Sequence, residues 1–113
     1  MAKLSELMRQ GAATRPQAFG DYTDASHCCT CAMGAVYEAI TGKLPHPEAE
    51  DGTACSVVNT IIYLETDILL SGYIVVDPIS HESQNLSSII SGLNDELRWT
   101  REEIADWLES EGL

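Results

Sequence analysis

The strongest structural signal in the sequence lies in residues 86–108, which read LSSIISGLNDELRWTREEIADWL. Apolar residues recur there at intervals of three and four residues from Leu86 to Leu97, which places them on one face of a helix about three turns long. We therefore expect a helix over residues 86–97 whose apolar face enters the core. The residues that form this face are Leu86, Ile89, Ile90, Leu93 and Leu97.

A second helix is predicted directly after Trp99. Thr100 and Glu103 have the spacing of a capping box, in which each side chain accepts a hydrogen bond from the backbone amide of the other residue. Trp99 and Ile104 occupy the two positions of a hydrophobic staple. The buried face of this helix is expected to comprise Ile104, Trp107 and Leu108, so the C-terminal part of the chain is predicted to be a helix, a tight corner and a helix.

Two helical segments are predicted in the first half of the chain. Apolar residues at helical spacing begin at Leu4, and Gly11 is expected to end that first helix. After a loop, a second helix is expected to open near Ser26 and to close at Gly42, where glycine permits a left-handed cap. The small residues Gly34 and Ala35 would let a neighbouring helix approach closely.

Residues 53–71 are rich in β-branched side chains, which favour a strand by propensity. Their apolar positions recur at about 3.6 residues, however, which favours a helix, with a break near Thr66 and Asp67. Residues 73–76 form a short apolar run that Asp77 and Pro78 end, and it is expected to be extended. Because no partner strand is evident, we do not expect a sheet.

These segments predict an all-α fold: a small single-domain bundle of four to five helices over residues 1–113, with at most one short extended segment. The helices at 86–97 and 101–110 are expected to pack on the helices at 28–41 and 54–70. The predicted core residues are Met33, Val36, Ile61, Leu64, Ile89, Ile90, Leu93, Leu97, Trp99, Ile104, Trp107 and Leu108.

Composition and charge narrow the function classes. The chain is 44% hydrophobic and 21% charged, which fits a globular domain and excludes wholesale disorder. Its net charge is -12, so its field repels phosphate polymers and anionic lipid headgroups, and no direct nucleic-acid or membrane partner is expected. No apolar run reaches the length of a secretory signal or of a membrane span. We expect a cytoplasmic protein whose thiols stay reduced.

One cluster of residues contains side chains that could carry out redox chemistry or bind a metal. Cys28 and Cys31 form a C-x-x-C pair at the start of a predicted helix, where the helix dipole would lower a thiol pKa. The same pair has the spacing of zinc ligands, and Cys55 with His27, or Cys29, could complete a tetrahedral site. Strong zinc signatures contain a second C-x-x-C or H-x-x-x-H pair, and this sequence has none. The alternative is that the cysteines are small buried apolar residues.

The C-terminal corner also has the spacing of a helix-turn-helix module, in which the second helix reads DNA. That helix carries five acidic residues against Arg101 alone, so its charge opposes contact with phosphate. Two pairs of carboxylates, Asp95-Glu96 and Glu102-Glu103, lie at helix ends, where capping and solvation explain them. No catalytic residue is assigned.

The strings Leu93-Asn94-Asp95, residues 99–108 (WTREEIADWL) and residues 31–35 (CAMGA) resemble a family of short uncharacterised bacterial and phage proteins. The resemblance covers the last third of the chain and a patch near residue 30. It implies a helical domain in a bacterial or prophage setting, and it implies no substrate or catalytic residue.

We therefore expect a small acidic, non-catalytic module that binds an unidentified protein partner or regulates it, with no cofactor. The alternative is a thiol or structural-zinc protein that uses Cys28, Cys31 and Cys55 together with His27.

Overall fold

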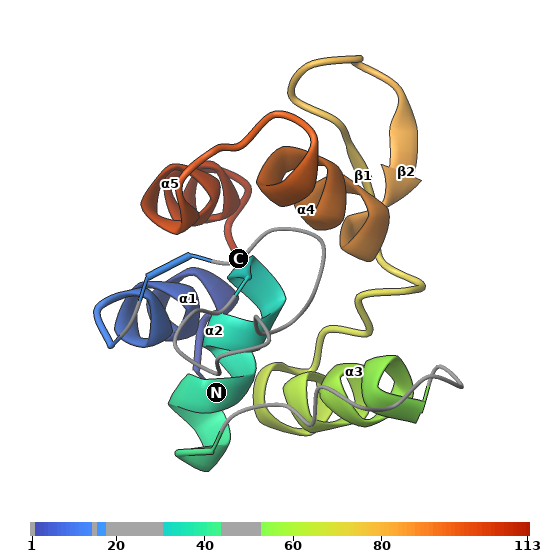
Figure 1. Cartoon of the computed structure of the whole chain (residues 1–113). Helices are drawn as coiled ribbons and strands as arrows, with labels where there is room; N and C mark the ends of the chain where they lie inside the picture. The colour runs from blue at the N-terminus through green and yellow to red at the C-terminus, as the bar shows by residue number, and fades with distance from the viewer. Residues whose placement is uncertain (1, 15, 18–30, 44–52) are drawn as a thin grey trace.

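The computed structural model of the chain describes residues 2–14, 16–17, 31–43 and 53–113, with only the backbone for residues 53–57. These residues form five helices and two strands (Figure 1). The fold is mostly helical, as predicted, but an antiparallel strand pair makes the all-α prediction too narrow. In chain order the elements are α1 (Leu4–Ala12), α2 (Ala32–Thr41), α3 (Thr53–Thr66), β1 (Ile74–Val76), β2 (Ser83–Asn85), α4 (Leu86–Asp95) and α5 (Arg101–Ser110).

Helices α1 and α2 cross with their backbones almost in contact. A Cβ atom on Gly11 would lie 1.9 Å from the backbone oxygen of Ala35, so only glycine fits at this crossing. The first helix ends at Ala12, one residue after the predicted end at Gly11. Gly11 lies in its last turn, where the approach of α2 requires glycine. The expectation that small residues of α2 admit a neighbouring helix is confirmed at Ala35, and that neighbour is α1.

Helix α2 begins later than its sequence suggests. Cys31 has an extended backbone (φ -74°, ψ 179°) and is the N-cap, so the helix starts at Ala32 rather than near Ser26, which lies outside the described residues. The predicted end is confirmed: Gly42 adopts a left-handed conformation (φ 72°), and its amide bonds to the carbonyl of Glu38.

Helix α3 ends at Thr66, and Asp67 follows in the left-handed region (φ 63°), which confirms the predicted break. Val58 and Ile62 are buried, so the buried stripe of α3 advances by four residues. Leu64 is 69% exposed, so its assignment to the core is wrong. It lies two residues, or about 200° of helical rotation, beyond Ile62 and therefore faces away from the core.

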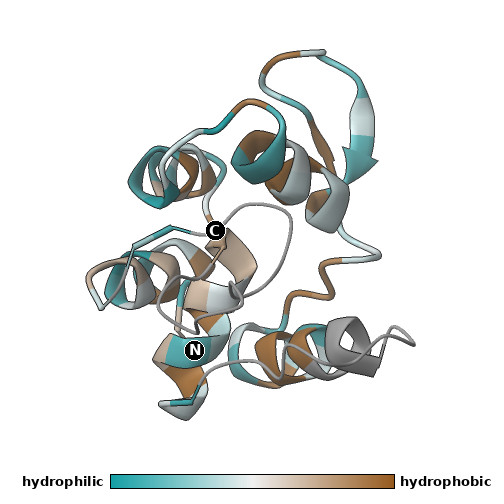
Figure 2. Cartoon of the chain, viewed as in Figure 1, coloured by the Kyte–Doolittle hydropathy of each residue, from teal (hydrophilic) through white to brown (hydrophobic). Residues whose placement is uncertain are grey.

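The two strands form an antiparallel pair with Ile74 opposite Asn85 and Val76 opposite Ser83. The expectation that no sheet forms is wrong because β2 is made of polar residues, Ser83 to Asn85, and therefore shows no apolar alternation (Figure 2). Its pairing depends on backbone groups, which every residue type supplies. The Asn85 side chain then caps α4 by accepting a hydrogen bond from the Ser88 amide at 2.9 Å.

The corner between α4 and α5 contains the predicted capping box. The Thr100 hydroxyl accepts a hydrogen bond from the Glu103 amide at 3.1 Å, and the Glu103 carboxylate accepts one from the Thr100 amide at 2.9 Å. Helix α4 stops at Asp95, two residues before its expected end. Leu97 therefore leaves the helical phase and is 49% exposed, so the prediction that it lies in the core is wrong.

One apolar cluster joins residues of all five helices. Helix α2 is central: it contacts α1, α3 and α4, whereas α5 packs mainly against α1 and less closely against α4 (Figure 1). The expected packing of α5 on α2 and α3 is thus replaced largely by contact with α1. Ile61 is half-buried, and Trp99 and Trp107 are partly buried against the cluster. Of the predicted core residues, those buried are Met33, Val36, Ile89, Ile90, Leu93, Ile104 and Leu108.

Candidate functional site

The cysteine segment is described only in part. His27, Cys28 and Cys29 lie outside the described residues, and Cys55 lies in the first turn of α3, where side chains are not described. Cys31 is buried and forms no disulfide. Within the described ranges, no group of three or more histidine, cysteine, aspartate or glutamate side chains is arranged to hold a metal ion. The zinc hypothesis therefore stays a prediction.

The Cys31 thiol serves as a helix cap. Its Sγ accepts a hydrogen bond from the Gly34 amide at 3.3 Å. Burial raises the pKa of the thiol to about 11 because the charged thiolate would lose its hydration, and hydrogen bonds from the Gly34 and Met33 amides offset only part of that effect. The expectation that the helix start lowers a thiol pKa is wrong for Cys31, which stays protonated and poorly nucleophilic at neutral pH.

A buried asparagine on α4 holds the start of α2. The Asn94 side-chain oxygen accepts hydrogen bonds from the Ala32 amide at 3.0 Å and from the Gln17 side chain at 2.8 Å. Its amide group donates to the Asp95 carboxylate at 2.6 Å. The role of Asn94 was not predicted, although one signal was present: it lies four residues after Ile90, at an apolar-face position that carries an amide. These contacts make Asn94 a structural link between two helices.

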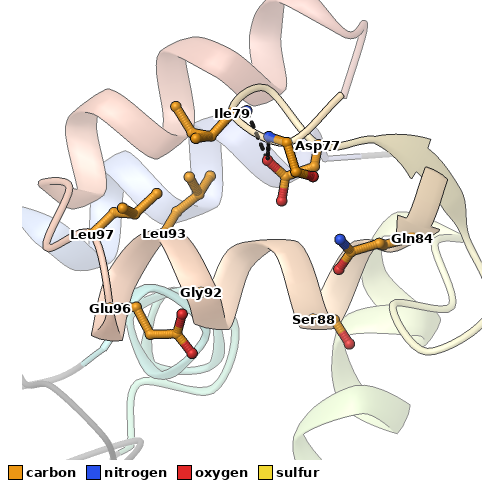
Figure 3. Close-up of a pocket in the computed structure, with 9 residues that line it drawn as sticks. Asp77, Ile79, Gln84, Ser88, Gly92, Leu93, Glu96 and Leu97 are labelled. Atoms are coloured by element: carbon orange, nitrogen blue, oxygen red, sulfur yellow. Dashed lines mark hydrogen bonds between the residues drawn. The ribbon is translucent and has the colours of Figure 1, made fainter. Parts of the chain in front are cut away.

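An open groove of about 460 Å³ lies between α4 and the turn that joins β1 to β2 (Figure 3). Leu93 of α4 and Leu97, which lies two residues after the end of α4, are beside Ile79 of the turn, and the three side chains form the apolar end of the groove. Ile79 and Leu97 are each about half exposed, so this end faces solvent. Leu97 and Ile79 are therefore surface residues of the groove and not parts of the core.

Two local features keep the groove open. The Asp77 carboxylate accepts hydrogen bonds from the Ile79 and Ser80 amides, at 2.7 and 3.0 Å, and so fixes the turn above α4. On α4, a Cβ atom at Gly92 would meet no atom within 4 Å, so the missing side chain leaves free space in the groove. The sequence signals for this site were the Asp-Pro turn and a glycine inside a helix.

The polar lining of the groove is acidic or neutral. Asp77 and Glu96 contribute carboxylates, Gln84 an amide and Ser88 a hydroxyl. Histidine, cysteine, lysine and arginine are missing from the described residues that line it. The groove can hold an apolar side chain beside a cationic group, and these lining residues offer neither a cysteine or lysine nucleophile nor a histidine base.

The C-terminal helix, which has the spacing of a DNA-reading helix, uses its arginine internally. Arg101 is buried, and its guanidinium donates to the Ala12 carbonyl at 3.3 Å, at the C-terminal end of α1. The exposed surface of α5 carries Glu102, Glu103 and Asp106. The expectation of no nucleic-acid partner stays a prediction.

None of the helices in the described parts of the chain is both long enough and apolar enough to cross a lipid bilayer. Comparison of the chain with known protein families, curated proteins and solved structures finds no match. The resemblance to short bacterial and phage proteins therefore stays a prediction.

Proposed function

We propose that this chain is a small acidic, non-catalytic protein-binding module, of bacterial or prophage origin and cytoplasmic, whose partner inserts an apolar side chain into the groove between α4 and the β1–β2 turn. The observation that carries this proposal is the pair of large apolar side chains, Ile79 and Leu97, held at the surface on either side of an open space. Exposed apolar residues that line one cavity are typical of a binding site, whereas scattered ones are not.

The charge of the groove indicates that the partner carries basic residues beside its apolar side chain. Residues 44–97 contain nine acidic residues and neither lysine nor arginine. Asp77 and Glu96 belong to this stretch and line the groove beside its apolar end. A partner segment that places lysine or arginine next to a leucine, isoleucine or methionine would match both features, and the acidic field would speed its association.

Gly92 allows a direct test. Because a side chain at this position projects into open space, Gly92→Phe should fill the groove without disturbing the core, and Gly92→Ala is a matched control that leaves most of the space free. Wild type and both variants are immobilised, exposed to a bacterial lysate and eluted with increasing salt, and the retained proteins are identified by mass spectrometry.

The proposal expects a protein that wild type and Gly92→Ala retain, that Gly92→Phe does not retain, and that elutes as salt screens the acidic surface. Glu96→Lys, which reverses one charge of the lining, should lower retention as well. Equal retention by all four proteins, or no protein that distinguishes wild type from Gly92→Phe, would contradict the groove as the binding site.

A further inference from the structure

Strand β1 has one edge that no described strand covers. The sheet has two strands, and β1 uses one edge for β2. The Tyr73 carbonyl accepts from the Leu86 amide at 2.8 Å, and the Asp77 amide donates to the Glu82 carbonyl at 2.9 Å. These bonds mark residues 73, 75 and 77 as the positions whose backbone groups turn toward β2. The backbone N–H and C=O groups of Ile74 and Val76 therefore point to the other edge.

The side chains at the same two positions are apolar and exposed. Ile74 is 63% exposed and Val76 is 51% exposed, whereas Val75 between them packs against the core. Natural edge strands are usually protected by lysine, proline or a bulge. Here the edge has β-branched side chains, which favour strand pairing. It thus combines backbone groups that pair with no described strand and an apolar face that a further strand would cover.

Charge decides which strand fits. Asp77 follows β1 directly, Glu82 lies opposite it across the hairpin, and no lysine or arginine occurs from residue 44 to residue 97. A second copy of this chain would bring the same acidic hairpin against itself, and its total charge of -12 as well. A basic strand avoids this repulsion.

We propose that the open edge of β1 binds an extended segment of a partner protein by strand addition, and that this segment alternates apolar residues with lysine or arginine. Backbone hydrogen bonds to Ile74 and Val76 supply the affinity, and the apolar side chains of the segment cover those of β1. Its basic side chains lie near Asp77 and Glu82. This inference concerns a different surface from the groove and does not depend on it.

The probe for the test is a short synthetic peptide that alternates valine and lysine, compared with a peptide of the same composition in scrambled order. Binding is followed by amide hydrogen exchange and by NMR chemical shifts of the labelled protein. The alternating peptide should slow the exchange of the Ile74 and Val76 amides about tenfold or more, and the scrambled peptide should not.

Val76→Pro removes one outward N–H and blocks the edge. Proline is tolerated there because the Val76 N–H does not bond to β2. We expect Val76→Pro to weaken peptide binding about tenfold, with an unchanged circular dichroism spectrum. Ile74→Lys, which keeps the backbone intact and repels the basic peptide, should weaken it as well and guards against a folding defect in the proline variant.

Gly92→Phe separates the two proposals, because it fills the groove and leaves β1 untouched. It should bind the alternating peptide as wild type does. The inference fails if the peptide does not bind, if Val76→Pro and Ile74→Lys bind it as tightly as wild type, or if the shifts map to α4 and the groove. The last result would support the groove and reject the edge.

Discussion

Two glycines that lie inside helices have opposite surroundings. Gly11 of α1 faces the backbone of α2, and a Cβ atom there would overlap the Ala35 carbonyl. Gly92 of α4 faces open space. Sequence periodicity treats both as helix-weakening residues, so it cannot tell a packing requirement from a vacant surface position. That distinction depends on which helices meet, which single-sequence patterns do not specify.

We expect Gly11→Ala to destabilise the protein by about 3 kcal/mol or more, because α1 and α2 must separate to admit the methyl group. The free energy of unfolding is measured by urea denaturation, with Gly92→Ala as the control. A loss below about 0.5 kcal/mol would show that the crossing relaxes easily.

We expect Gly92→Ala to stabilise the protein by about 0.5 to 1 kcal/mol, since alanine loses less backbone entropy than glycine in a helix and meets no obstacle here. The melting temperature should rise in calorimetry. A fall would mean that the position is more crowded than the open groove indicates.

The buried Cys31 thiol should make stability depend on alkaline pH. Its pKa rises from 9.0 to about 11 on burial, so between these values the unfolded chain has released the proton and the folded chain still holds it. Stability from this group is complete below pH 9 and is lost as the pH rises toward 11, by about 2 kcal/mol in all. Cys31→Ser keeps a capping side chain without this titration, so its unfolding free energy should fall less over the same range. Parallel curves for the two proteins would contradict the assignment.

At the scale of elements, the predictions succeeded where the signal is local. The capping box at Thr100 and the left-handed end at Gly42 each depend on residues a few positions apart, and both are present. The start of α2 and the strand β2 were missed because distant partners determine them: Asn94 of α4 holds the Ala32 amide, and β1 supplies the pairing for a strand of polar residues.

Asn94→Leu should therefore destabilise the protein by about 2 to 3 kcal/mol, because leucine fills similar space and leaves the buried Ala32 amide without an acceptor. Thr100→Ala, which removes a cap at the surface, should cost only about 1 kcal/mol. Thermal or urea unfolding of both variants measures the difference. Equal costs would show that Asn94 contributes no more than an ordinary cap.

At the scale of the whole molecule, the apolar face of each helix was largely predictable from the sequence. Which helices pack against each other was not. α1 and α5 lie at opposite ends of the chain yet pack together, and Arg9 of α1 forms ion pairs with Asp106 and Glu109 of α5, at 2.7 and 3.3 Å. No spacing within either helix indicates this contact. The groove was missed for the same reason, because it arises where α4 meets a turn whose strand pair was not expected.

The net charge of -12 should make the folded state sensitive to ionic strength. Added salt screens repulsion among the acidic side chains, so the melting temperature should rise by a few degrees, roughly, between low and physiological salt. A neutral osmolyte at equal osmolality is the control. No rise, or a fall, would show that screened ion pairs such as those of Arg9 outweigh the repulsion.

Asn94 lies next to a residue that lines the groove and also holds two helices together. Leu93 lines the groove, and the next residue, Asn94, accepts a hydrogen bond from the first amide of α2, that of Ala32. A bound side chain large enough to displace α4 would also strain the hydrogen bond between Asn94 and the Ala32 amide. The size of side chain that the groove can accept is therefore limited by the packing of α4 on α2. A bulky occupant of the groove is therefore expected to weaken the contact between α4 and α2 as well.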